Sequence, residues 1–281
     1  ADPAYELIDE ADCILAVGFD VVELVKPWLQ DAPLIWIAPW QNYDPHIAAV
    51  HEYVGQTAPL LSLLASTVNI QVPASWGSQR VAQFRSKKTQ NRIAKPAAGR
   101  INPQEVLRVI RDHAADTTVI TTDVGSHKIF TALAWPAPTP NRYFVSNGLS
   151  AMGFGLPAAI AVARITQQPT LCITGDAGLA MVTGELSLAV AMNLPVIIFM
   201  MNDNALDLIR SAQQREGKAV YGTTFTNPDY SLIAAGYGLN YHRVDDIHSC
   251  AAAFQLALTA NGPTLIDVQV DPSTYSTAVN Q

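Results

Sequence analysis

Two apolar runs that each end in oxygen-bearing side chains constrain what this chain can fold into. The run in residues 170–177 ends at Asp176, and the run in residues 196–204 ends at Asp203. Such runs are typical of buried parallel strands, whose carboxyl ends meet at one edge of an open α/β sheet, where cofactors bind. The two aspartates are 27 positions apart (203 − 176), which leaves room for a crossover helix, expected over 183–193. We therefore expect adjacent strands and one shared site.

The alternation of helical and strand-like patterns along residues 101–281 predicts six strands with helices between them. This rhythm is typical of an α/β fold with a doubly wound parallel sheet. The expected strands are 117–122, 143–146, 171–174, 195–201, 241–244 and 264–270, and the expected helices are 103–113, 129–134, 153–164, 183–193, 230–235 and 248–260, with Asn102 as the cap of the first helix.

Residues 1–70 show the same rhythm with fewer strands, as expected for part of a second, Rossmann-like domain. The chain starts inside a βα unit, so we expect this first domain to be incomplete. Residues 71–100 are polar with a basic bias, which favours a solvated linker; contact with an anionic ligand is the alternative. The patterns before the linker predict strands 13–17 and 34–38 and helices 4–11, 21–30 and 57–67.

The composition of the 281 residues argues against nucleic acid and membrane partners. The formal net charge is −7, and no apolar run reaches the ~18 residues of a membrane span. Three cysteines lie far apart and provide neither metal-ligand spacing nor a disulfide framework. The N-terminus also lacks the pattern of a signal peptide, so we expect a cytoplasmic protein.

Oxygen ligands at strand ends suit a hard cation. Asp176 and Asp203 fit Mg²⁺ or Ca²⁺ holding a phosphate, because Mg²⁺ usually takes one or two protein carboxylates; loop capping is the alternative. Residues 123–127 open a helix, so their N–H groups can meet an anion, although His127 taken alone is more often structural. The glycines of 147–157 allow close backbone approach but lack the G-x-G-x-x-G spacing of a nicotinamide dinucleotide site. These strand ends predict a site for a diphosphate and a divalent cation.

The chain resembles the thiamine-diphosphate-dependent enzymes of the acetolactate synthase, pyruvate decarboxylase and benzaldehyde lyase superfamily. The signature of that superfamily, Gly-Asp-Gly followed later by Asn-Asn, corresponds here to Gly175-Asp176-Ala177 and Asn202-Asp203. Residues 148–159 and the segments around both motifs are similar to the acetolactate synthase branch. The resemblance is strong over residues 100–270 and weak over residues 1–70.

The resemblance implies a role for each matching residue. It makes Asp176, Asp203 and the backbone carbonyl of Ala205 the metal ligands. The carbonyl of Ser150 would accept a hydrogen bond from the 4′-amino group of the cofactor, and Met152 would be the apolar residue that forces the cofactor to bend. Met152 and His127 are thus the expected catalytic residues; taken without the family, Met152 would be a core residue. The residues expected to hold the diphosphate or to line the cofactor site are Gly125, Ser126, His127, Ala177, Gly178, Leu206, Asp207 and Leu208.

Two departures from the signature carry consequences. Ala177 replaces the second glycine, which is tolerable only where the backbone avoids positive φ. Asp203 replaces an asparagine, which keeps an oxygen ligand but adds a negative charge beside an anionic diphosphate. We expect weaker cofactor affinity or an altered pH dependence from this second change.

In such enzymes a glutamate on a separate pyrimidine-binding domain activates the cofactor, and no segment of this chain resembles that domain. We therefore expect the chain to be the C-terminal part of a larger enzyme. The other part would come from a nicked or split polypeptide or from another subunit, and complete units would form a dimer or tetramer. FAD binding is not expected, because the stretch 18–23 lacks the arginine that the acetolactate synthases use.

The leading hypothesis is a thiamine-diphosphate- and Mg²⁺-dependent lyase or transferase. Its substrate would be a 2-oxo acid or a related carbonyl compound, which would undergo decarboxylation, carboligation or both, with Leu206, Leu208 and Ile209 as candidate substrate contacts. A non-catalytic regulatory or structural homologue is the alternative. A nucleotide-dependent oxidoreductase is disfavoured by the missing glycine fingerprint.

Overall fold

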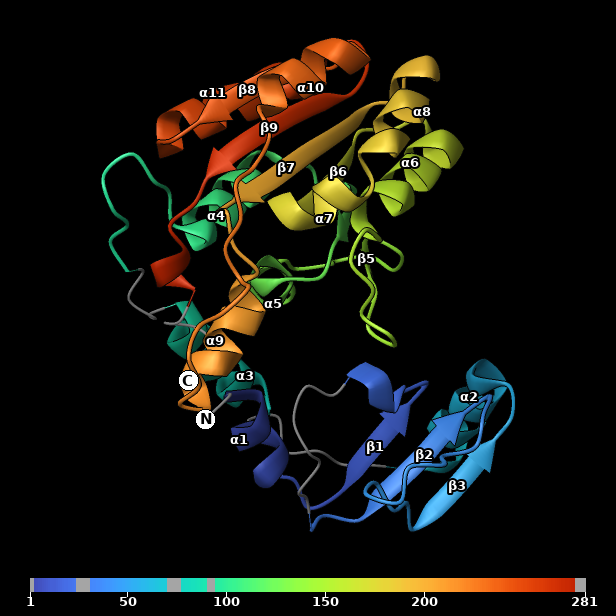
Figure 1. Cartoon of the computed structure of the whole chain (residues 1–281). Helices are drawn as coiled ribbons and strands as arrows, with labels where there is room; N and C mark the ends of the chain where they lie inside the picture. Colours follow the sequence, from blue (N-terminus) through green and yellow to red (C-terminus); the bar gives the residue numbers. More distant parts are fainter. Residues whose placement is uncertain (1–2, 24–30, 70–76, 90–93, 276–281) are drawn as a thin grey trace. The chain divides into compact units, whose positions relative to one another are not determined.

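The computed structural model describes residues 3–23, 31–69, 77–89 and 94–275. The chain divides near residue 92 into two units, each with its own parallel sheet (Figure 1). Among the described residues, no helix is long and apolar enough to cross a membrane.

The sheet of the C-terminal unit has six strands, all parallel, in the order β5-β4-β6-β7-β9-β8. The chain runs from β4 to the edge strand β5 and then crosses to β6 on the other side of β4. The strand order therefore reverses between β4 and β6, and open α/β sheets bind ligands outside the carboxyl ends of strands at such a switch point. The strands are β4 (Val119–Thr122), β5 (Tyr143–Val145), β6 (Thr170–Gly175), β7 (Val196–Asn202), β8 (Asn240–Val244) and β9 (Thr264–Gln269).

Helices cover both faces of this sheet, as the alternation of strand side chains shows. In β7, Ile197 and Phe199 belong to one apolar cluster, whereas Val196 and Ile198 belong to the other. The doubly wound parallel sheet predicted from the sequence is thus confirmed. The first face packs against α4 (Pro103–His113), α5 (Ser126–Ala134) and α11 (Ile247–Thr259), and the second against α6 (Gly155–Thr166), α7 (Asp176–Met181), α8 (Leu186–Ala191) and α10 (Tyr230–Tyr237).

The first helix of this unit begins where the sequence indicates. Asn102 accepts a hydrogen bond from the N–H of Gln104 (2.9 Å), and Pro103 occupies the first helical position, where its missing N–H costs nothing. The buried face of α4 includes Val106 and Ile110.

The N-terminal unit has a three-stranded parallel sheet in the order β1-β2-β3, one strand more than the sequence predicts. Its core contains Leu34 and Trp36, and Phe19 meets Trp36 edge to face with ring centroids 6.1 Å apart. The elements are α1 (Pro3–Asp9), β1 (Ile14–Val17), a 3₁₀ turn (Val21–Glu23), β2 (Leu34–Ala38), β3 (His51–Val54), α2 (Thr57–Thr67) and α3 (Ser78–Thr89).

Several elements differ from the sequence prediction. The extra strand β3 was missed because all four of its side chains are exposed and carry no apolar pattern. The expected linker 71–100 contains the helix α3, whose composition is polar, and Arg80 of α3 forms an ion pair with Glu10. Of the helix expected over 21–30, the 3₁₀ turn is described, and residues 24–30 lie outside the described residues.

Candidate functional site

Three strand ends of the C-terminal unit are joined by hydrogen bonds at the switch point. Asp123 follows β4, Asp176 follows β6 and Asp203 follows β7. The N–H of Asn204 donates to Oδ2 of Asp176 (2.7 Å), which ties the end of β7 to the end of β6. Thr174 of β6 donates through its hydroxyl to Oδ2 of Asp123 (3.3 Å), which ties β6 to β4. The predicted meeting of the two motifs at one sheet edge is confirmed.

Asp123 organises the loops at this edge. It is fully buried, and its carboxylate accepts hydrogen bonds from the N–H of Gly153 (2.9 and 3.0 Å) and of Val124 (2.7 Å). Burial raises the pKa of Asp123, and the hydrogen bonds to its carboxylate oppose that rise. A Cβ at Gly178 would lie 2.9 Å from its Oδ2, and one at Gly155 would lie 3.0 Å from its backbone N, so both glycines leave room for Asp123.

The carboxylate of Asp176 is held on both oxygens. Oδ1 accepts from the N–H of Ala177 (2.8 Å), and Oδ2 accepts from Asn204 and from the side-chain amide of Asn227 (2.6 Å). The residue is 1% exposed, and burial raises its pKa. Such a carboxylate is oriented before any ligand arrives.

Asp203 faces the same edge with fewer partners. Its Oδ1 accepts from the N–H of Ala205 (3.0 Å). Burial, followed by the negative charge of Asp176, raises the pKa of Asp203 to about 8. Among the described residues no group of three or more His, Cys, Asp or Glu side chains is arranged to hold a metal. A cation here would therefore have two protein carboxylates, which is the number that Mg²⁺ usually accepts.

Ala177 lies in the first turn of α7 and is absent from the residues with positive φ. The backbone at Ala177 thus avoids positive φ, which is the condition under which alanine can replace the second glycine of the signature.

His127 lies buried against the end of β6. A Cβ at Gly175 would be 3.2 Å from Cε1 of His127, and one at Gly125 would be only 2.4 Å from the same atom. Gly125 has φ 154°, so a side chain there is excluded by both contact and conformation. Burial lowers the pKa of His127 to about 4, so the imidazole is neutral, and its Nε2 has no hydrogen-bond partner among the described residues. Buried polar atoms without a partner are rare in folded proteins, so Nε2 of His127 is a candidate binding point for a ligand or a water.

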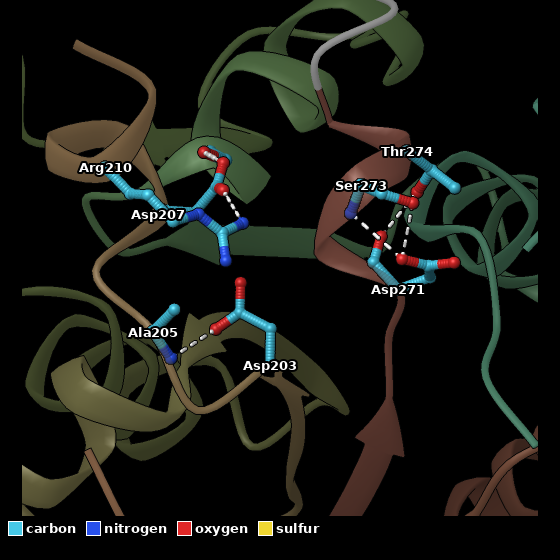
Figure 2. A network of polar contacts seen from close by, with 8 residues as sticks. Asp203, Ala205, Asp207, Arg210, Asp271, Ser273 and Thr274 are labelled. Carbon is cyan, nitrogen blue, oxygen red and sulfur yellow. Dashed lines mark hydrogen bonds and ion pairs between the residues drawn. The ribbon is translucent and has the colours of Figure 1, made fainter. Parts of the chain in front are cut away.

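Ser126 and Asp207 connect the start of α5 to the helix that follows the Asp203 loop, α9 (Asp207–Arg215). The hydroxyl of Ser126 donates to Oδ2 of Asp207 (2.6 Å). Oδ1 of Asp207 forms an ion pair with Nη2 of Arg210 (2.5 Å). Figure 2 shows the guanidinium group of Arg210 between the carboxylates of Asp207 and Asp203. The sequence pattern indicated neither α9 nor a role for Arg210.

The loop with the expected pyrimidine contacts is fixed by Lys128 of α5. Its Nζ donates to the carbonyl of Ser146 (2.8 Å) and to Oγ of Ser150 (3.3 Å), and burial lowers its pKa. Ser150 has the left-handed φ of 48°. Met152 is half-buried and is not a member of either apolar cluster described for this unit, unlike an ordinary core residue.

A segment that the sequence did not single out contacts the loop after β7, residues 203–206, which is the metal loop expected from the resemblance. The N–H of Leu206 donates to the carbonyl of Thr223 (2.8 Å), and Ala205 forms an antiparallel bridge with Thr224. Leu206 and Leu208 are half-buried, and Ile209 is 54% exposed. The backbone of the metal loop is thus supported from outside its own motif.

Asn227, in the same segment, is half-buried and begins a chain of polar side chains that continues through buried residues. It donates to Oδ1 of Asn202 (2.9 Å), and Asn202 donates to Oδ1 of Asp267 (2.9 Å), while Tyr230 donates to the carbonyl of Asp176 (3.0 Å). The one signal in the sequence was the acidic Asp267 inside the otherwise apolar run of β9.

The sheet and this edge define a cofactor-binding α/β domain, with paired carboxylates and a buried neutral histidine at its switch point. Residues 123–268 match the family model described as "Thiamine pyrophosphate enzyme, C-terminal TPP binding domain", and the chain belongs to that family. The expected membership of the superfamily, in its C-terminal half, is confirmed.

The curated relatives similar to this chain include acetolactate synthases. The chain is 34% identical over 280 residues to the acetolactate synthase isozyme 1 large subunit of Escherichia coli K12, covering 94% of this chain and 48% of that protein. It is 25% identical over 289 residues to the acetolactate synthase of Bacillus subtilis 168, covering 99% and 50%. It is 33% identical over 184 residues to the acetolactate synthase large subunit of Buchnera aphidicola from Acyrthosiphon pisum, covering 63% and 32%. The chain thus spans about half or less of the length of these relatives.

Proposed function

We propose that this chain supplies the diphosphate- and metal-binding part of a thiamine-diphosphate-dependent enzyme that decarboxylates a 2-oxo acid, joins the acyl fragment to a second carbonyl compound, or both. The observation that carries the proposal is that two carboxylates, Asp176 and Asp203, follow the neighbouring strands β6 and β7, while a buried, neutral His127 packs against the end of β6. Nε2 of His127 has no hydrogen-bond partner among the described residues. Family membership and the acetolactate synthase relatives support it.

The residues at this edge fit the proposed cofactor and metal. Asp176, Asp203 and the carbonyl of Ala205 would hold Mg²⁺, or Ca²⁺ in its place, because all three offer hard oxygen atoms. The neutral ring of His127 hydrogen-bonds the backbone of Asp123 through its other nitrogen, which leaves Nε2 as an acceptor, so Nε2 would receive its missing partner from a water bound to the diphosphate. Gly125 and Gly178 leave room around these residues. A Cβ at Gly125 would lie 2.4 Å from Cε1 of His127, and a Cβ at Gly178 would lie 2.9 Å from Oδ2 of Asp123.

The remaining residues would orient the cofactor. The carbonyl of Ser150 would accept from its 4′-amino group, and Met152, outside the apolar clusters, would keep the ring bent. Lys128 holds the loop that carries Ser150. When bound, thiamine diphosphate supplies a nucleophilic carbon for attack on the substrate carbonyl, and the protein supplies orientation and a water-poor site.

The substrate and partner follow from the same proposal. Leu206, Leu208 and Ile209 offer apolar contacts to the acyl group. A polypeptide carrying the pyrimidine-binding domain and its activating glutamate would complete the site, in a dimer or tetramer of complete units.

The test combines the chain with the polypeptide that carries the pyrimidine-binding domain. With thiamine diphosphate and Mg²⁺ present, we expect CO₂ release from a set of 2-oxo acids and formation of a carboligation product, both lost in Asp176→Asn. Cofactor binding without any turnover of that set would favour the non-catalytic homologue. Failure of the assembled protein to bind the cofactor would contradict the proposal.

A further inference from the structure

The edge that would hold the cofactor is crowded with negative charge. Asp176 and Asp203 follow the neighbouring strands β6 and β7, and Asp207 begins α9 four residues after Asp203. A carboxylate that binds a metal ion is ionised. A diphosphate would add further negative charge beside them, and Mg²⁺ alone brings two positive charges.

Arg210 is the cation placed at this cluster. It lies three residues after Asp207 in α9, so the two side chains share one face of the helix. Asp207 is held in turn by Ser126 through its other oxygen (2.6 Å), so the guanidinium is anchored to a fixed carboxylate. The side chain of Arg210 is only 21% exposed, so its interactions are screened less than those of a surface arginine.

The free side of the guanidinium faces the metal loop. In Figure 2 it lies between Asp207 and Asp203. Arg100, also at this edge, is directed to the carbonyls of Asn202 and Val270.

We propose that Arg210 is a positioning residue whose charge, held in place by Asp207, offsets the negative charge of Asp203 and so allows an anionic diphosphate to bind beside that carboxylate. The inference rests on the proposed function for the identity of the ligand. The negative charge of Asp203, which is expected to weaken cofactor affinity, would then be balanced by the positive charge of Arg210.

A double-mutant cycle tests this pairing. Binding of thiamine diphosphate with Mg²⁺, and separately of inorganic diphosphate with Mg²⁺, is measured by calorimetry for the 281-residue chain and for Asp203→Asn, Arg210→Gln and the double variant. We expect Arg210→Gln to weaken both affinities about tenfold when Asp203 is present and less than about twofold when Asn is at position 203. Arg210→Lys should restore most of the affinity, because it restores the charge.

The control is Arg215→Gln, which removes the same charge from the exposed end of the same helix and should leave both affinities unchanged. Thermal unfolding of each variant without ligand shows whether it is folded. An equal loss from Arg210→Gln in both backgrounds would overturn the inference, since Arg210 would then contact the diphosphate directly or support only the fold. If the unmodified chain bound neither ligand, the proposed function would fail first and the inference with it.

Discussion

The side-chain amide of Asn227 donates to Oδ2 of Asp176 at 2.6 Å and to Oδ1 of Asn202 at 2.9 Å. One residue therefore fixes a proposed metal ligand of β6 and the last residue of β7, although it lies 24 positions after Asp203 (227 − 203). Groups that orient metal ligands contribute to affinity without touching the metal. The geometry of the proposed metal site thus depends on a residue outside both signature motifs.

Replacing Asn227 should weaken metal binding without unfolding the domain. For Asn227→Ala we expect Mg²⁺-dependent cofactor affinity to fall about 10- to 100-fold, as for other groups that orient metal ligands. Calorimetry at several Mg²⁺ concentrations measures this. Asn261→Ala is the control, because it removes an exposed amide from the loop before β9, at the opposite end of the strands. Equal affinities for Asn227→Ala and the unmodified chain would refute the role of Asn227.

The stability of the domain should depend on pH through His127. Its folded-state pKa of about 4 lies below the ordinary value of 6.5, so the unfolded chain binds more protons between these values. The contribution is fully present above pH 6.5 and is lost as pH falls towards 4. Since one pKa unit corresponds to about 1.4 kcal/mol, the loss amounts to a few kcal/mol at most.

Urea unfolding of the unliganded chain at a series of pH values, with His127→Gln as the comparison, checks this prediction. The variant should lose less stability on acidification than the unmodified chain. Asp123 acts in the opposite direction, because a carboxyl with a raised pKa stabilises the fold at low pH, but it is present in both proteins. Parallel pH profiles for the two proteins would show that His127 is not buried as a neutral group.

Gly125→Ala should disturb the cradle around His127. The new Cβ would lie 2.4 Å from Cε1 of His127, at a backbone φ of 154°. We expect a loss of about 1–3 kcal/mol in the free energy of unfolding, together with weaker cofactor binding. Gly148→Ala is the matched control, since a Cβ at Gly148 meets no atom within 4 Å. A change of the same size in both variants would argue against a special role for Gly125.

Lys128 should affect the pyrimidine side of the site and not the diphosphate side. Its two hydrogen bonds hold the loop that carries Ser150, so Lys128→Met should reduce affinity for thiamine diphosphate by about tenfold. Affinity for inorganic diphosphate with Mg²⁺ should stay the same. Lys218→Met, which changes an exposed lysine paired with Glu216, should alter neither. Equal losses for the two ligands would mean that Lys128 acts on the diphosphate.

The elements predicted correctly from the sequence are those whose buried residues form a local apolar pattern. Central strands of the larger sheet such as β7 were found because a strand buried on both faces reads as a continuous apolar run. The strand β3 and the helix α9 were missed because their exposed or charged residues resemble those of loops. Local sequence patterns therefore predicted the elements of the core and missed the elements at its edge.

The residues of the candidate site likewise fall into those that a local pattern predicted and those that it missed. Asp176 and Asp203 stand directly after strands, so sequence spacing brought them together correctly. Asn227 and the buried Asp123 act through contacts with residues distant in the sequence, which no local pattern records. Arg210 contacts Asp207 three residues before it, but in a helix that the sequence did not predict. The expected effect of the Asp203 charge on cofactor affinity also has to be judged from the structure, because the sequence does not show that the guanidinium group of Arg210 lies between Asp207 and Asp203 (Figure 2).

The most direct test of the account is whether this chain binds a diphosphate in a magnesium-dependent way through Asp176. Calorimetric titration with thiamine diphosphate and with inorganic diphosphate, each with Mg²⁺ and with EDTA in its place, measures this for the unmodified chain and for Asp176→Asn. The account predicts binding of both ligands by the unmodified chain that requires Mg²⁺ and is lost in Asp176→Asn. Binding that persists in EDTA or in the variant, or no binding of either ligand by the folded, unmodified chain, would contradict it.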